Sequence, residues 1–164
     1  MAENTARTQA FKVDVQALVE QMKAEGKTII TFSLKQKYFD AILAGRKVQE
    51  FREIRPTTVK HLIQLDKDGF DIEDENGFAI PIHYDAILFY TGKYEAGKKR
   101  DCCLVEITDS IVQYLTDDDD EIIEYKVDYN GQKDVWWQES RVVYNLGAIL
   151  AVNIYNESQK KNVL

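Results

Sequence analysis

Cysteine and histidine are scarce in this chain of 164 residues, which contains two of each. The cysteines, Cys102 and Cys103, are neighbours, and a bridge between adjacent strand residues would be strained. His61 and His83 stand alone, so no Cys/His spacing predicts a zinc site. Two reduced thiols are typical of a reducing compartment, and we therefore expect a cytoplasmic protein. Nothing in the sequence predicts a metal or an organic cofactor.

Long apolar runs are also missing. No stretch approaches the roughly 18 apolar residues that a membrane-crossing helix needs. Residues 1–10 are polar and contain no apolar core of a secretion signal, so we expect neither a signal peptide nor a membrane partner. We predict loose tails at residues 1–10 and 157–164, on either side of a single domain of residues 11–156.

Acidic residues outnumber basic ones by 28 to 21, which gives a formal net charge of −7. Proteins that wrap duplex nucleic acid are usually basic, so this balance argues against broad nucleic-acid binding but permits a local basic pocket. Part of the acidity lies in Asp117–Glu121. We interpret this run as a solvated loop, because its spacing matches no cation-binding loop.

The patterns along the chain predict helices early and strands later. Residues 14–25 have apolar residues at helical spacing and begin with Asp14, a residue typical of helix N-caps. A second helix is predicted between Ser33 and Gly45, because Ser33 and Gln36 have the spacing of a capping box and glycine can end a helix.

Short runs rich in β-branched and apolar residues predict strands. These runs are residues 28–32, 47–54, 61–65, 86–90, 101–112, 122–128, 142–144 and 148–155. Asn130-Gly131 is typical of a hairpin turn, and residues 66–77 are expected to form a loop or hairpin. We predict a short helix or turn at residues 134–139, a turn at Tyr144–Gly147, and no internal repeat.

Helices followed by many short strands favour an α+β fold. We expect the strands to close, or nearly close, into a barrel, because closure removes exposed strand edges.

One segment resembles a known protein family. Residues 45–52 match the Gly-x-Lys-x-x-Glu-x-Arg motif of ASCH domains, which belong to the PUA-like superfamily. Residues 103–108 carry Glu106 and resemble the second motif strand of that family. The resemblance covers about residues 28–155 and leaves the helix at 14–25 as an addition.

The resemblance implies a fold and an activity. The fold would be a PUA-like mixed or antiparallel β-barrel with two or three flanking helices. ASCH domains are proposed to bind RNA or nucleotides, and some small bacterial members resemble amidohydrolases that deacylate N4-acetylcytidine with a lysine, a threonine and a glutamate. Those positions fall on Lys47, Glu50 and Glu106. Because Glu50 replaces the threonine, the hydroxyl of such a site is missing here.

The residue types suit a small polar cleft. A lysine that loses solvation at a cleft floor, such as Lys47, can act as a nucleophile or general base. Arg52 shares a strand face with Glu50 and offers a planar fork for a phosphate or carboxylate. Glu106 lies between two apolar residues, so we expect it to be buried and paired with Lys47 or Arg52. Lys47 joins this site only if residues 45–48 form a turn or bulge.

Other side chains are weaker candidates for ligand binding. Lys35, near the start of the second helix, is expected to face the same cleft. Tyr90 and Lys93 belong to a loop with further cations at residues 98–100, which could grip a phosphate or could simply be solvated. Trp136-Trp137 could stack a base, although core or interface packing is the simpler interpretation.

Three functions therefore remain open. The first is an ASCH-type domain that holds RNA, a nucleotide or a modified nucleoside in a small polar cleft. The second is an amidohydrolase with a Lys/Glu site, and the third is a protein-interaction domain with no small-molecule site. A salt-bridge ladder on a barrel strand would explain the Lys-Glu-Arg stretch without any ligand.

Overall fold

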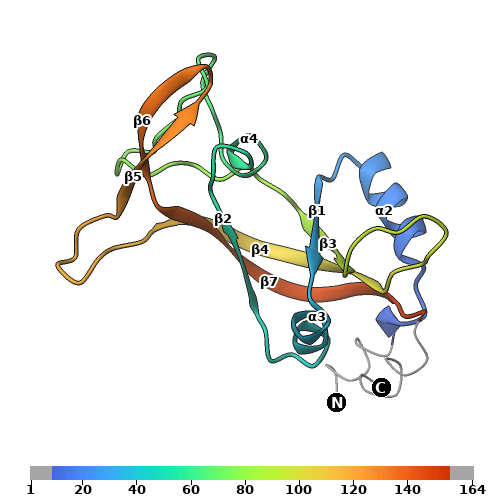
Figure 1. Ribbon diagram of the computed structural model, residues 1–164. Helices are drawn as coiled ribbons and strands as arrows, with labels where there is room; N and C mark the ends of the chain where they lie inside the picture. Colours follow the sequence, from blue (N-terminus) through green and yellow to red (C-terminus); the bar gives the residue numbers. More distant parts are fainter. Residues whose placement is uncertain (1–8, 156–164) are drawn as a thin grey trace. The chain divides into compact units, whose positions relative to one another are not determined.

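The computed structural model describes residues 9–155, so the predicted tail 157–164 and most of the predicted tail 1–10 lie outside the described residues. The helices are α2 (Val15–Ala24), α3 (Gln36–Leu43) and α4 (Val59–Leu62). The strands are β1 (Ile29–Leu34), β2 (Gln49–Glu53), β3 (Ala86–Thr91), β4 (Cys102–Tyr114), β5 (Glu124–Tyr129), β6 (Gln132–Gln138) and β7 (Ser140–Asn153) (Figure 1). None of the described helices is long and apolar enough to span a membrane.

The strands form a mixed five-stranded sheet and a separate hairpin. The hydrogen-bonded order in the large sheet is β1-β3-β4-β7-β2, while β5 pairs with β6. Strand β1 runs parallel to β3, and β3 runs antiparallel to β4. The predicted α+β class is confirmed. The pairing of the described strands leaves β1 and β2 at the edges of the sheet, so it does not close the expected barrel.

The chain divides into two compact units, each described by itself below. Unit 1 contains the described parts of residues 1–48, 84–108 and 145–164, and unit 2 contains residues 49–83 and 109–144.

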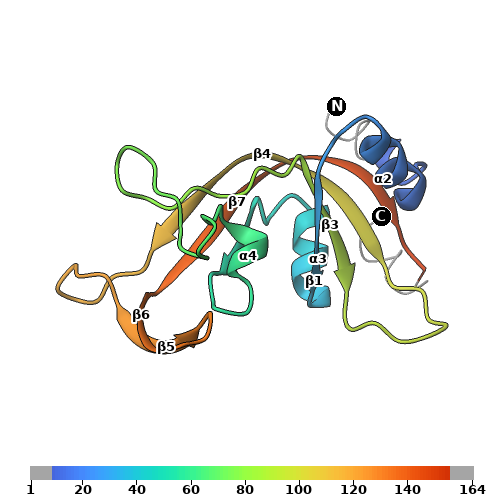
Figure 2. The same cartoon turned by 90° about the horizontal axis from the view of Figure 1, so that it is seen from above.

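Strand β3 forms the centre of unit 1 and is buried on both faces. Ala86 and Leu88 pack with Val15 and Val19 of α2 in one apolar cluster. The alternate residues of β3 point the other way, towards the face where α3 contacts the strand. Figure 2 shows α2 and α3 on opposite sides of β3. A strand covered on both faces has an unbroken apolar run, and the strand predicted at residues 86–90 is confirmed as part of β3.

Two of the helix ends predicted from neighbouring residues are confirmed, and one is wrong. The Asp14 side chain accepts a hydrogen bond of 2.9 Å from the Ala17 N–H, which confirms the predicted cap of α2. Gly45 has a φ of +77° directly after α3 and confirms the predicted end of that helix. The predicted capping box at Ser33 is wrong, because Ser33 still belongs to β1 and pairs with Tyr90 of β3, so α3 begins later.

Unit 2 contains three turns with the same hydrogen-bond pattern. In each turn an aspartate side chain, from Asp66, Asp74 or Asp117, accepts from backbone N–H groups two and four residues later. The fourth residue of each turn has a positive φ, and it is glycine in the first two turns and Asp120 in the third. The first two turns form a repeat with a period of eight residues, Asp-x-x-Gly-Phe-x-Ile, which contradicts the expectation of no repeat. The third turn is formed by the acidic run.

Three predicted elements are wrong. The predicted strand at residues 61–65 is the end of α4 followed by isolated bridges. Residues 134–139 are mostly strand β6, because the turn at Asn130-Gly131, with φ of +53° and +78°, directs them back along β5. Residues 144–147 form no turn but lie within the continuous strand β7.

Glycines 69 and 77 provide a matched test of the repeated turns. Both have a φ above +75°, so alanine at either position should cost about 1–2 kcal/mol. An added Cβ at Gly69 would also lie 3.0 Å from Asn130 Nδ2 and 3.3 Å from the Tyr129 hydroxyl, whereas one at Gly77 meets nothing within 4 Å. We therefore expect Gly69→Ala to lower the free energy of unfolding by about 1 kcal/mol more than Gly77→Ala. Urea denaturation measures the free energy of unfolding of both variants. Equal losses would contradict the expectation that the contacts with Asn130 and Tyr129 add to the cost at position 69.

Cys102 and Cys103 are expected to be inert in the folded protein. Both are buried, and burial raises the pKa of Cys102 to about 11 and that of Cys103 further. At pH 8 roughly a thousandth of Cys102 would be thiolate, so reaction with a disulfide reagent should wait for unfolding. Because the unfolded thiols lose their protons first, stability should also fall as pH rises above about 8.5. Fast reaction of either thiol with the reagent at pH 8 in the absence of denaturant would refute this prediction.

Candidate functional site

The motif segment begins with a tight turn in unit 1. The N–H groups of Arg46 and Lys47 both donate to the carbonyl of Ala41, at 2.9 Å and 3.1 Å, directly after α3 ends. Residues 45–48 therefore form a turn, which was the condition for Lys47 to join a site. Lys47 is half-buried, and its Nζ lies 5.7 Å from the centre of the Tyr38 ring. A cation over an aromatic ring in this way restricts where the ammonium group can lie.

Strand β2 carries the rest of the motif into unit 2. Glu50 is buried with 5% of its surface exposed, and its Oε1 lies 3.7 Å from Arg52 Nε on the same strand face. The Phe51 N–H also donates to Oε1, at 3.1 Å. Burial lowers the pKa of Arg52, and the Glu50 carboxylate opposes this by stabilising the charged guanidinium. The alternation of the strand thus brings this predicted pair together.

Glu106 does not match its expectation, because the structure places it at an exposed position in unit 1. The first four residues of β4 are buried, and the burial ends at Val105. Cys102 and Leu104, on the same face as Glu106, pack against α2, but the apolar cluster does not extend to Glu106. The carboxylate instead lies against Gly147 of β7, where an added Cβ would be 2.6 Å from Oε1. The glycine therefore makes room for this side chain rather than forming a turn.

The remaining candidates lie in unit 1. Lys35 is exposed at the N-cap of α3 and makes no side-chain capping bond. Lys93 is exposed in the loop after β3, whereas Tyr90 is partly buried, which raises the pKa of its hydroxyl. The Arg100 guanidinium lies 4.5 Å from the centre of the Tyr90 ring and donates to the Gly92 carbonyl at 3.1 Å. Arg100 also donates to the Ser33 hydroxyl at 3.4 Å, so its guanidinium already has partners within unit 1.

The structure brings Glu50 and Arg52 together within unit 2. Lys47, Glu106, Lys35, Tyr90 and Lys93 belong to unit 1. Their convergence with the pair on β2 therefore stays a prediction.

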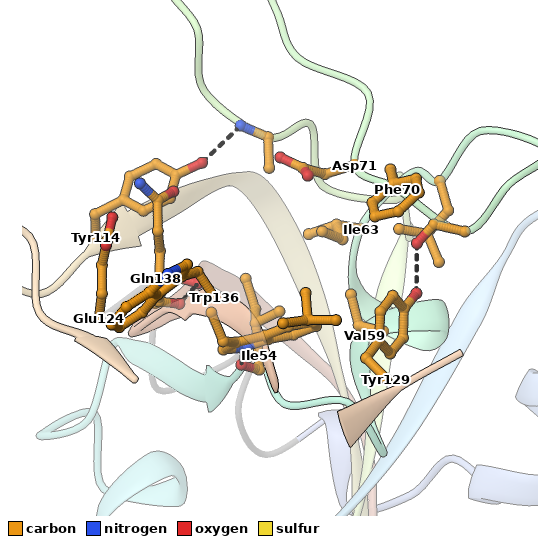
Figure 3. A pocket seen from close by; sticks show the side chains of 16 residues that line it. Ile54, Val59, Ile63, Phe70, Asp71, Tyr114, Glu124, Tyr129, Trp136 and Gln138 are labelled. Carbon is orange, nitrogen blue, oxygen red and sulfur yellow. Dashed lines mark hydrogen bonds between the residues drawn. The ribbon is translucent and has the colours of Figure 1, made fainter. Parts of the chain in front are cut away.

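A pocket of about 290 Å³, which was not among the predicted sites, lies entirely within unit 2 (Figure 3). Its walls are mainly aromatic and aliphatic, with a few polar groups, which is typical of small-molecule sites. The residues that line it are Ile54, Val59, Ile63, Leu65, Gly69, Phe70, Asp71, Ala79, Tyr114, Glu124, Tyr129, Val135, Trp136, Trp137, Gln138 and Ser140. Of these, the sequence indicated only the two tryptophans as a place where a base could stack. The glycine-aromatic repeat at Gly69-Phe70 was the other available signal.

Hydrogen bonds to the backbone hold the aromatic walls of this pocket. The Tyr114 hydroxyl accepts from the Ala79 N–H at 3.0 Å, and the Tyr129 hydroxyl donates to the Gly69 carbonyl (Figure 3). Trp137 Nε1 donates to the Ile54 carbonyl at 2.9 Å, and the Tyr129 and Trp137 rings meet edge to face at 5.1 Å. Three rings from different segments are therefore fixed before any ligand enters.

Within residues 9–155, no group of three or more His, Cys, Asp or Glu side chains is arranged to hold a metal ion. No family model matches the sequence, and comparison with curated proteins and with solved structures gives no match either.

Arg52 and Arg55 offer a matched pair for testing the buried ion pair. Arg52→Met leaves the buried Glu50 carboxylate without this cation and should lower the free energy of unfolding by roughly 2–3 kcal/mol. Arg55 lies closer to its partner, at 2.7 Å from Glu53, but both side chains are exposed, so Arg55→Met should change the melting temperature little. Thermal and urea unfolding compare the two variants. Similar losses of stability in the two variants would contradict the expectation that burial of Glu50 makes its ion pair with Arg52 more important for stability than the exposed pair.

Proposed function

We propose that the chain is an ASCH-type module of the PUA-like superfamily, and that it binds RNA, a nucleotide or a modified nucleoside in a small polar cleft. The observation that carries the proposal is the buried Glu50 carboxylate beside Arg52 on the motif strand. Desolvating such a pair costs free energy that apolar side chains of similar volume would not cost. A binding role explains why charged groups occupy this position.

Arg52 is suited to be the anion-binding group of this cleft. Its side chain is 28% exposed, and its Nε lies 3.7 Å from Glu50 Oε1, which is an ion pair rather than a hydrogen bond. The planar guanidinium has several N–H groups in a fork that matches a phosphate or carboxylate. Lys47 and Lys35 supply further positive charge at the two ends of α3 in a chain that is acidic as a whole. Readers of unpaired RNA depend on such local groups rather than on long basic surfaces.

The amidohydrolase remains a second proposal, with Lys47 as its activating group. The exposed position of Glu106 gives the amidohydrolase no additional support. The cytoplasmic setting stays part of the proposal and rests on the two buried, unbridged thiols.

A binding panel tests the proposed function. We expect short single-stranded RNAs or nucleotides to raise the melting temperature, with an affinity that falls as salt rises. Lys47→Ala should weaken RNA binding several-fold and reduce the salt slope by about one. Lys23→Ala, at an exposed position on α2, is the control and should leave binding unchanged.

Other outcomes of the panel separate the alternatives. Release of acetate from N4-acetylcytidine, lost in Lys47→Ala, would favour the amidohydrolase over simple binding. If no RNA, nucleotide or nucleoside shifts the melting temperature, the protein-interaction domain becomes the better explanation.

A further inference from the structure

We infer that the aromatic pocket of unit 2 binds an unpaired base that carries an exocyclic amino group, and that it holds this base without contacting a phosphate. The inference deepens the proposed function and rests on it, because it names the part of an RNA or nucleoside that unit 2 would recognise. It concerns different residues from the motif, so the two can be tested separately.

The size and walls of the pocket favour a flat ring system. A volume of about 290 Å³ lies at the lower end of the range for small-molecule sites, which suits one or two fused rings. Phe70, Tyr114, Tyr129, Trp136 and Trp137 all line it. Figure 3 shows Tyr114 on the opposite side of the pocket from Phe70 and Tyr129. Aromatic surfaces on several sides bind a planar base by stacking, whatever the base.

The polar groups of the pocket select among planar ligands. Asp71, Glu124 and Gln138 line it, and none of its 16 lining residues, all within the described part of the chain, is lysine or arginine. Two carboxylates without a cation repel a phosphate or any other anion. They accept hydrogen bonds from N–H groups, as acidic side chains do from the amino group of cytosine. An amino-bearing base therefore fits better than uracil.

The lining is prepared for such a ligand before binding. The hydroxyls of Tyr114 and Tyr129 and the indole N–H of Trp137 are already bonded to the backbone. No hydrogen bond or ion pair within residues 9–155 occupies the carboxylate of Asp71 or Glu124. The rings are fixed while the acceptors are available, an arrangement that reduces the entropy cost of binding.

Lys126 lies beside the pocket and does not belong to its lining. It is exposed on β5, and its Nζ lies 5.1 Å from the centre of the Trp136 ring. The lining itself contains no cationic side chain.

Titration of free nucleosides tests the inference. Quenching of tryptophan fluorescence should show binding of adenosine and cytidine, with uridine about tenfold weaker. The nucleoside 5′-monophosphates should bind no more tightly than the nucleosides, because no lining residue is cationic. Trp136→Ala should weaken cytidine binding about tenfold or more, measured by calorimetry. Trp136 is 64% exposed, so the variant should fold, and Tyr94→Ala, at a residue 78% exposed in unit 1, is the control.

The carboxylates are tested by Glu124→Gln and Asp71→Asn, with Glu121→Gln as control. At least one of the two pocket variants should reduce the preference for cytidine over uridine. Uridine binding as tightly as cytidine in the unaltered protein, or cytidine binding that Trp136→Ala leaves intact, would overturn the inference. RNA binding that depends on Lys47 without any nucleoside binding would also overturn it, yet would leave the proposed function standing. Binding of choline or trimethyl-lysine in place of nucleosides would identify a cation site instead.

Discussion

The architecture of unit 2 depends on one constraint: the backbone of residues 63–82 forms no regular strand, and its polar groups still need partners. Aspartate side chains satisfy some of them within the two repeated turns. The hydroxyls of Tyr114 and Tyr129 satisfy others from distant parts of the chain. The same bonds that complete this irregular segment therefore set the walls of the pocket, so the turns and the pocket form one structure.

Local features could be predicted wherever neighbouring residues decide them. Asp14 caps α2, Gly45 ends α3, and Asn130-Gly131 forms a hairpin turn, because each depends on the φ or hydrogen bonds of a few adjacent residues. Prediction failed where distant pairing decides. Ser33 remains in β1 because β3 pairs with it, and Gly147 lies within β7 because a side chain of β4 needs the space. Neither partner is visible in the local sequence.

The candidate site shows the same division. Alternation along a strand was sufficient to place Glu50 and Arg52 on one face. The exposure of Glu106 could not be predicted, because it depends on how far the apolar cluster with α2 extends along β4. The pocket was missed for a related reason. Its lining comes from several segments, and neither Trp136-Trp137 nor the repeat at Gly69-Phe70 indicates by itself that the two share a pocket.

The tryptophans and the cysteines of this chain can each be used to follow the unfolding of one unit. Both of its tryptophans lie in unit 2, and both of its cysteines lie in unit 1. Indole emission therefore follows the state of one unit, and thiol accessibility follows the state of the other. Whether the two units open together or in sequence can be read from the native chain, with no label attached.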